Sequence, residues 1–94
     1  MELTDNNYLS IFDLELNKFI RENPNQEIVG VVSLKTLEIL ETSPNLLYIR
    51  EPSNNIIRKW RNSIDIIIDE KLEYSEEDFY FITKKNYKEE KNGK

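Results

Sequence analysis

The spacing of apolar residues predicts a helix near the start of the chain. Residues 9–22, with the sequence LSIFDLELNKFIRE, place apolar side chains three and four positions apart. Ser10 followed by Asp13 resembles a capping box at the start of such a helix. The apolar stripe consists of Phe12, Leu16, Phe19 and Ile20. We interpret this stripe as the face that packs on the core.

The next third of the chain alternates between short apolar runs and one helical segment. Residues 27–33 form a β-branched run that predicts a buried strand, and Gly30 within it indicates a bulge or a close backbone approach. Ser33 suits the N-cap of a helix that continues to about residue 42. Residues 46–51 predict a second strand. We therefore expect a strand–helix–strand unit in this region.

Residues 54–61, with the sequence NNIIRKWR, carry the only tryptophan of the chain among basic residues. In a helix, two isoleucines and Trp60 fall within roughly 100° of arc and face the core. In a strand, Arg58 would instead share a face with Ile56 and Trp60. We favour a short helix or helical turn. In this interpretation the core residues are Ile56, Ile57 and Trp60, and the residues that face water are Arg58, Lys59 and Arg61.

The final third contains the clearest strand pattern. Residues 64–72, IDIIIDEKL, alternate in a way that predicts a strand with one buried and one partly wet face. Residues 79–83, FYFIT, are aromatic and β-branched and predict a last strand. The polar residues 86–94 predict a disordered tail. We therefore expect one α+β domain over residues 1–85, with about four mostly antiparallel strands, two helices and a short helical turn.

The composition argues against an enzyme. The chain has no His and no Cys, which removes the usual general base near neutral pH, the thiolate nucleophile and the common zinc ligands. Two isolated glycines do not make a phosphate-binding loop. Asp69-Glu70-Lys71 resembles half of the PD-(D/E)xK nuclease motif, but no Asp lies between residues 42 and 64 to complete it. We expect no catalytic residue, no metal and no cofactor.

The net charge of −5 is unevenly distributed along the chain. Residues 65–78 hold seven acids and one base, a net charge of −6, and residues 53–64 hold three bases and no acid. These blocks are either solvated surface or a contact surface for a charged partner or a second copy. Tryptophan and arginine are frequent at the energetic centres of interfaces. The candidate interaction residues are Arg58, Trp60 and Arg61 in the basic block and Asp69, Glu70, Glu73, Glu76 and Glu77 in the acidic block.

We interpret the chain as a small protein that binds another protein through this charged surface. The alternatives are a self-associating assembly protein, for which a dimer is plausible, and an acidic DNA mimic that blocks a DNA-binding protein. Nucleic acid is not an expected partner, because the sequence pI is about 4.8 and the acidic block repels phosphate. The absence of a long apolar run and the Ile-, Asn-, Lys- and Glu-rich composition predict a cytoplasmic protein of a low-GC bacterium or its phage.

Residues 28–83 resemble a central-domain segment of HK97-type phage capsid proteins. The resemblance lies in the order of the segments IVGVVSLKTLEIL, YIREP, RNSIDIIIDEKL and DFYFI. It implies a self-assembling shell subunit, or a small protein derived from the central domain of one. The chain has Asn62-Ser63-Ile64 where that family usually carries a glycine and a proline, and it has no counterpart of the long N-terminal region and spine helix. No functional residue is carried over from the family.

Overall fold

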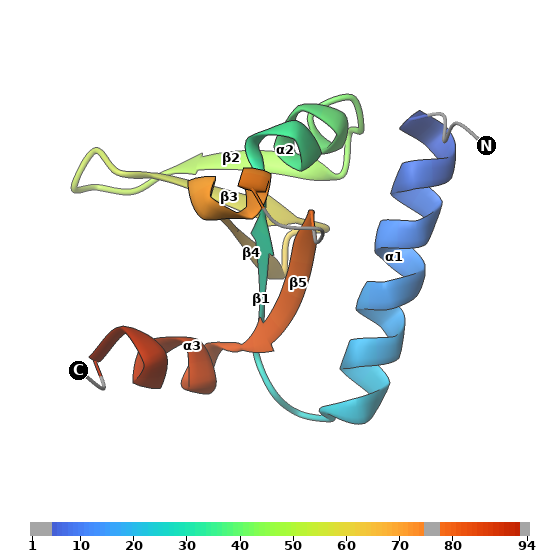
Figure 1. Cartoon of the computed structure of the whole chain (residues 1–94). Helices are drawn as coiled ribbons and strands as arrows, with labels where there is room; N and C mark the ends of the chain where they lie inside the picture. The colour runs from blue at the N-terminus through green and yellow to red at the C-terminus, as the bar shows by residue number, and fades with distance from the viewer. Residues whose placement is uncertain (1–4, 75–77, 93–94) are drawn as a thin grey trace.

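The computed structural model of the chain describes residues 5–74 and 78–92, which form a five-stranded sheet with helices on both faces (Figure 1). The elements are α1 (Asp5–Glu22), β1 (Ile28–Val32), α2 (Leu34–Leu40), β2 (Leu46–Arg50), β3 (Ile56–Trp60), β4 (Ile64–Ile68), the 3-10 helix η1 (Glu70–Tyr74), β5 (Phe79–Thr83) and α3 (Lys84–Asn92). The strand order is β2-β3-β4-β1-β5, with β1 and β4 parallel and the other neighbours antiparallel. The predicted α+β class is confirmed.

The larger core lies between the sheet and helices α1 and α2. Phe12 and Leu16 of α1 are at most 1% exposed, and Phe19 packs against the same core, so these three residues of the predicted stripe face the core. Ile20, the fourth, is 39% exposed, so its place in the stripe was wrong. The centre of the Phe12 ring lies 5.5 Å from that of Trp60, 4.9 Å from that of Phe79 and 5.1 Å from that of Phe81. Phe12 therefore joins α1 to strands at two separate places in the sheet.

A smaller core lies on the other face of the sheet, where η1 and α3 are placed on the side opposite to α1 (Figure 1). Val29 and Val31 of β1 pack there with Leu72 of η1, and Tyr87 of α3 packs against the same cluster. Because η1 and α3 are short, they cover this face only in part. The space between them is the pocket described below.

Two predictions about β1 and α2 are confirmed. Ser33 is the N-cap of α2, and its Oγ accepts a hydrogen bond from the backbone N–H of Thr36 at 3.1 Å. Gly30 lies at a close approach, because a Cβ at this position would stand 3.1 Å from Ile66 Cδ1 and 3.3 Å from Phe81 Cε1. The neighbouring side chains thus use the space that a larger residue would need.

The segment 54–61, expected to be helical, contains strand β3 (Ile56–Trp60), so the prediction was wrong. Trp60 is inward-facing as predicted, at 1% exposure, but its cross-strand partners are Leu46 and Ile64. Ile56 was expected beside it in the core and is 53% exposed. Pairing with β2 on one side and β4 on the other satisfies the backbone of β3, which a single helical turn could not do.

The turn that joins β3 to β4 has a sequence that does not predict a hairpin. Arg61 and Asn62 both have a left-handed backbone, with φ of 54° and 62°, and the Ser63 N–H donates to the Trp60 carbonyl at 3.2 Å. This is the arrangement of a type I′ hairpin turn, for which Asn-Gly is the usual signal. Arginine is uncommon in the left-handed region, so the sequence carries little indication of the turn.

The C-terminal tail, predicted to be disordered over residues 86–94, forms helix α3 as far as Asn92. Thr83 Oγ1 accepts a hydrogen bond from the Asn86 N–H at 3.2 Å, which caps the first turn. Tyr87 then packs against the smaller core. One capped turn and one partly buried ring thus supply the contacts that the polar composition did not suggest.

Two further boundaries differ from the prediction. α1 begins at Asp5, so Ser10 and Asp13 lie inside the helix and do not cap it. The strand expected over residues 64–72 ends at Ile68. There, Asp69 Oδ1 accepts the backbone N–H of Lys71 at 2.9 Å and turns the chain into η1. A local side-chain bond of this kind competes with continued pairing in the sheet.

Tyr8 joins α1 to α2 through a part-buried hydrogen bond and gives the fold a dependence on alkaline pH. Its hydroxyl lies 2.6 Å from Thr36 Oγ1, and burial raises the pKa of Tyr8 above its ordinary 10.0. The folded state therefore favours the neutral phenol. The contribution of Tyr8 to the free energy of unfolding is present below pH 10 and is lost as the pH rises through the raised pKa. We expect Tyr8→Phe to weaken the fall in the free energy of unfolding above pH 10, measured with urea. A variant with the same alkaline dependence as the wild type would contradict this.

Candidate functional site: an acidic pocket lined by tyrosines

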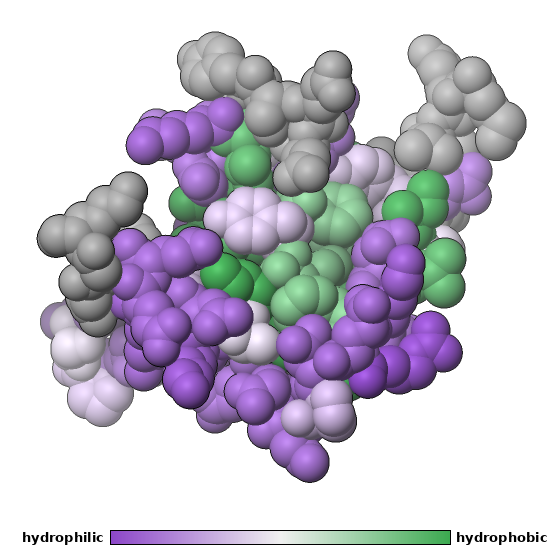
Figure 2. Space-filling model, turned by 60° about the horizontal axis from the view of Figure 1, so that its bottom comes forward, coloured by the Kyte–Doolittle hydropathy of each residue, from purple (hydrophilic) through white to green (hydrophobic). Residues whose placement is uncertain are grey.

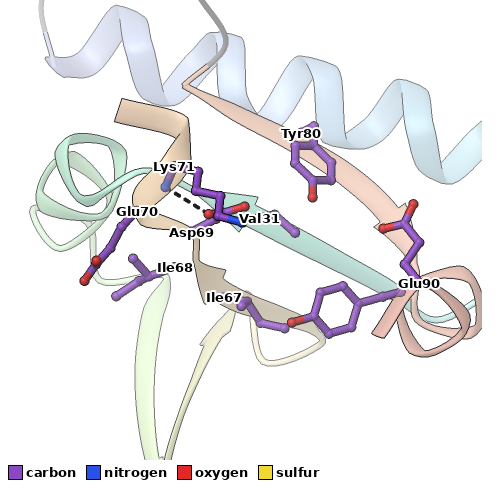
Figure 3. Close-up of a pocket in the computed structure, with 9 residues that line it drawn as sticks. Val31, Ile67, Ile68, Asp69, Glu70, Lys71, Tyr80 and Glu90 are labelled. Atoms are coloured by element: carbon purple, nitrogen blue, oxygen red, sulfur yellow. Dashed lines mark hydrogen bonds between the residues drawn. The ribbon is translucent and has the colours of Figure 1, made fainter. Parts of the chain in front are cut away.

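A pocket of about 510 Å³ opens on the second face of the sheet, between η1 and α3 (Figure 3). Its apolar lining comes from Val31 of β1 and from Ile67 and Ile68 of β4. Tyr80 of β5 and Tyr87 of α3 complete the walls. Because β1 lies between β4 and β5, the sheet order brings these three strands to one surface. The pocket is thus built from segments that are far apart in the sequence.

Among the residues that the structure describes, four charged ones line the pocket. Asp69, Glu70 and Lys71 come from the junction of β4 and η1, and Glu90 comes from α3. In Figure 3, Glu90 and Tyr80 lie across the pocket from the Asp69–Lys71 segment, with Glu70 directed away at the rim. Three carboxylates and one ammonium give the lining a negative balance. This balance suits a ligand with a positive group.

Asp69 has a structural role as well as its place in the lining. One of its carboxylate oxygens accepts the backbone N–H of Lys71 at 2.9 Å, which is drawn as a dashed line in Figure 3. The bond fixes the Asp69 side chain at the start of η1. The Asp-x-Lys triplet that resembles half of a nuclease motif is therefore a capped turn in this fold.

Asp65, the first acid of the acidic block, belongs to an ion-pair cluster. Its carboxylate oxygens lie 3.0 Å from Lys59 Nζ and 3.8 Å from Lys84 Nζ. Lys84 also lies 3.7 Å from Glu27. The side chains of Asp65 and Lys59 are only 24% and 29% exposed, so the two charges neutralise each other within the fold. The acidic and basic blocks thus pair with each other in part inside one chain.

Trp60 and Arg61, predicted to contact a partner, are engaged inside the chain through Asp13. The indole Nε1–H of Trp60 donates to Asp13 Oδ1 at 2.8 Å, and Arg61 lies 3.0 Å from Asp13 Oδ2. Trp60 is 1% exposed, so it offers no surface to a partner, and its assignment as a contact residue is corrected. Asp13 gave no sequence signal for this role, because its partners are 47 and 48 positions away.

Arg58, the remaining basic candidate, lies partly buried on the hairpin of β2 and β3. Its guanidinium carbon is 5.7 Å from the centre of the Tyr48 ring, within the range of a cation–π contact. The Tyr48 hydroxyl donates to the Glu41 carboxylate at 2.7 Å. Partial desolvation and this hydrogen bond raise the pKa of Tyr48, while Arg58 acts in the opposite direction. Arg58 thus contacts Tyr48 and is not among the residues that line the acidic pocket.

The five acidic candidates are only partly placed by the structure. Asp69 and Glu70 line the pocket. Glu73 lies in η1, but its side chain is outside the described part of the chain, and Glu76 and Glu77 are outside it altogether. Among the described side chains, no group of three His, Cys, Asp or Glu residues could hold a metal ion. None of the described helices is long and apolar enough to cross a membrane.

Sequence reasoning found one side of the pocket and missed the other. Asp69 and Glu70 stood out because they belong to the acidic block. Strand propensity is the only signal that Tyr80 carries in the sequence, and Tyr87 and Glu90 lie in the segment predicted to be disordered. The spacing Thr83–Asn86–Tyr87 could have indicated a capped helix with one apolar anchor. No local pattern, however, indicates that β5 lies beside β1.

A scan against protein-family models, a search of curated proteins and a search of solved structures found no match to this chain.

Proposed function

We propose that the chain is a non-enzymatic binding protein that takes a cationic side chain of a partner protein into the pocket between η1 and α3. The observation that carries the proposal is a pocket with an apolar floor that is lined by two tyrosines and by three carboxylate residues, of which Glu70 lies at the rim. Carboxylates attract an arginine or lysine head group, and aromatic rings add a cation–π contact. The methylene stem of the same side chain can lie on Val31 and Ile67.

Lys71 favours a peptide as the ligand over a simple cation. Its ammonium lines the same pocket as the three acids, so the site has a hydrogen-bond donor beside its acceptors. A peptide backbone supplies a carbonyl next to each cationic side chain, whereas an isolated amine does not. The volume of about 510 Å³ also exceeds what one side chain fills, which leaves room for the adjoining residues.

The proposal is tested by titrating the ¹⁵N-labelled protein with short capped peptides that contain arginine or lysine, followed by NMR. We expect amide shifts at Asp69–Lys71, Tyr80 and Tyr87, and none with a matched glutamate peptide. The double variant Glu70→Lys/Glu90→Lys should bind the basic peptide about tenfold or more weakly. Two exposed charge contacts of up to ~1 kcal/mol each account for that factor.

A matched control carries the same change in net charge outside the pocket. Glu38 on α2 and Glu89 on α3 are exposed and do not line the pocket, so Glu38→Lys/Glu89→Lys should bind nearly as well as the wild type. If the two double variants lost the same amount of affinity for the basic peptide, the peptide would be responding to the overall charge of the protein. In that case the pocket is not the binding site.

A further inference from the structure

Strand β5 lies at an edge of the sheet, and this edge faces the viewer in Figure 1, between α1 and α3. Its inner side pairs with β1 in the antiparallel direction. Two backbone hydrogen bonds flank this ladder. The Ser33 N–H donates to the Asp78 carbonyl at 2.9 Å, and the Lys84 N–H donates to the Glu27 carbonyl at 2.8 Å. Along an antiparallel strand, the N–H and C=O groups of alternate residues point toward the same neighbour. Those of Tyr80 and Ile82 therefore also point toward β1.

The N–H and C=O groups of Phe79 and Phe81 therefore point away from the sheet. Within residues 5–74 and 78–92, no backbone hydrogen bond outside the regular elements reaches them. Natural edge strands are commonly protected by a charge, a proline or a bulge. The sequence FYFIT of β5 has none of these, whereas the opposite edge strand β2 ends in Arg50.

The surroundings of this edge are apolar and hollowed. A groove of about 240 Å³ is lined by Phe19 of α1 together with Phe79, Tyr80 and Phe81. Figure 2 shows apolar and weakly polar side chains gathered in the middle of this face, with hydrophilic side chains on both margins. None of the four residues Phe79–Ile82 is fully buried, although three of them are aromatic. Such an edge suits the addition of another strand.

We propose that β5 pairs antiparallel with β5 of a second copy, so that the two sheets join into one across a two-fold axis. With the axis at Tyr80, Phe79 of each copy faces Phe81 of the other. Residues 79 and 81 are the ones whose backbone groups point outward, so the four groups on each copy are all satisfied. This register also places aromatic residues opposite one another on both faces of the joined sheet.

The charges beside the groove favour a second copy of this chain as the occupant. Glu15, Lys18 and Glu22 of α1 line the groove in the order acid, base, acid. In a two-fold arrangement the α1 helices run past each other in opposite directions. Lys18 of one copy can then approach a carboxylate of the other, and the contact is made twice. An isologous interface of this kind needs no further component.

The test is the mass of the full chain by sedimentation or light scattering over a range of concentrations, at low and high salt. We expect a species of twice the 11.3 kDa chain mass that persists at high salt, because its main contacts are backbone hydrogen bonds and aromatic rings. Hydrogen exchange by NMR should show the Phe79 and Phe81 amides becoming protected as the concentration rises. A chain of 11.3 kDa at every concentration, with both amides unprotected, would overturn the proposal.

Two lysine variants locate the interface. Tyr80→Lys places two like charges opposite each other at the proposed axis and should shift the equilibrium to the monomer by at least tenfold. Leu47→Lys puts the same charge on the opposite edge strand β2, where Leu47 is 39% exposed, and should leave the dimer intact. Circular dichroism checks that each variant is folded. A dimer that survives Tyr80→Lys but is lost in Leu47→Lys would also overturn the proposal.

Discussion

Replacement of Phe12 by alanine is expected to lower the free energy of unfolding by about 3–5 kcal/mol. Phe12 is fully buried, and its ring contacts those of Trp60, Phe79 and Phe81. Alanine would leave a cavity where α1 meets the sheet, and these rings cannot close it without leaving their own contacts. The loss is a large part of the roughly 5–15 kcal/mol that holds a typical domain together. Urea unfolding followed by circular dichroism measures it.

The control for this prediction lies on the same helix. Leu14 is 62% exposed, so Leu14→Ala makes the same type of truncation without opening a cavity. We expect it to change the free energy of unfolding by less than about 0.5 kcal/mol. If Phe12→Ala were as stable as Leu14→Ala, α1 would not be docked on the sheet as described.

Replacement of Asp13 by leucine is expected to cost about 1–3 kcal/mol, the second largest effect. The Trp60 indole N–H donates to this carboxylate at 2.8 Å, and Trp60 itself is 1% exposed. Leucine would leave that donor buried without an acceptor, which costs more than the net value of one hydrogen bond. The same urea experiment measures the change, and Trp60 fluorescence reports on the indole environment.

Two variants separate the hydrogen bond from the ion pair at this site. Asp13→Asn keeps an acceptor for the indole and should lose less stability than Asp13→Leu. Arg61→Ala removes the ion pair, whose arginine side chain is 43% exposed, and should cost at most ~1 kcal/mol. An Arg61→Ala variant as unstable as Asp13→Leu would show that the ion pair, and not the buried indole, is the main contribution of Asp13.

The parts of the fold that were predictable from sequence are those with strong local signals. The helical stripe around Phe12 and Leu16, the Ser33 cap and the aromatic run of β5 all act over a few residues. All three elements are present in the structure. The strand β3 was not predictable in this way, since a five-residue apolar and basic run fits a helical turn or a strand. Only its pairing with β2 and β4 decides between them.

Only the part of the candidate site that has a strong local signal was predictable from the sequence. Asp69 and Glu70 are conspicuous in the sequence, because they lie in a segment of net charge −6. Their position opposite Tyr80 and Glu90 depends on the strand order and on α3, and neither follows from local pattern. For Trp60 the sequence supports both a core position and a contact role, and the structure confirms the core position, because the ring is 1% exposed.

The most direct test of the proposed function is an isotope-filtered nuclear Overhauser experiment on the labelled protein with an unlabelled arginine- or lysine-containing peptide. We expect contacts from the side-chain methylenes of the basic residue to the rings of Tyr80 and Tyr87 and to the methyl groups of Ile67. Peptide binding with contacts only to other surfaces, such as the Tyr48 hairpin, would contradict the account.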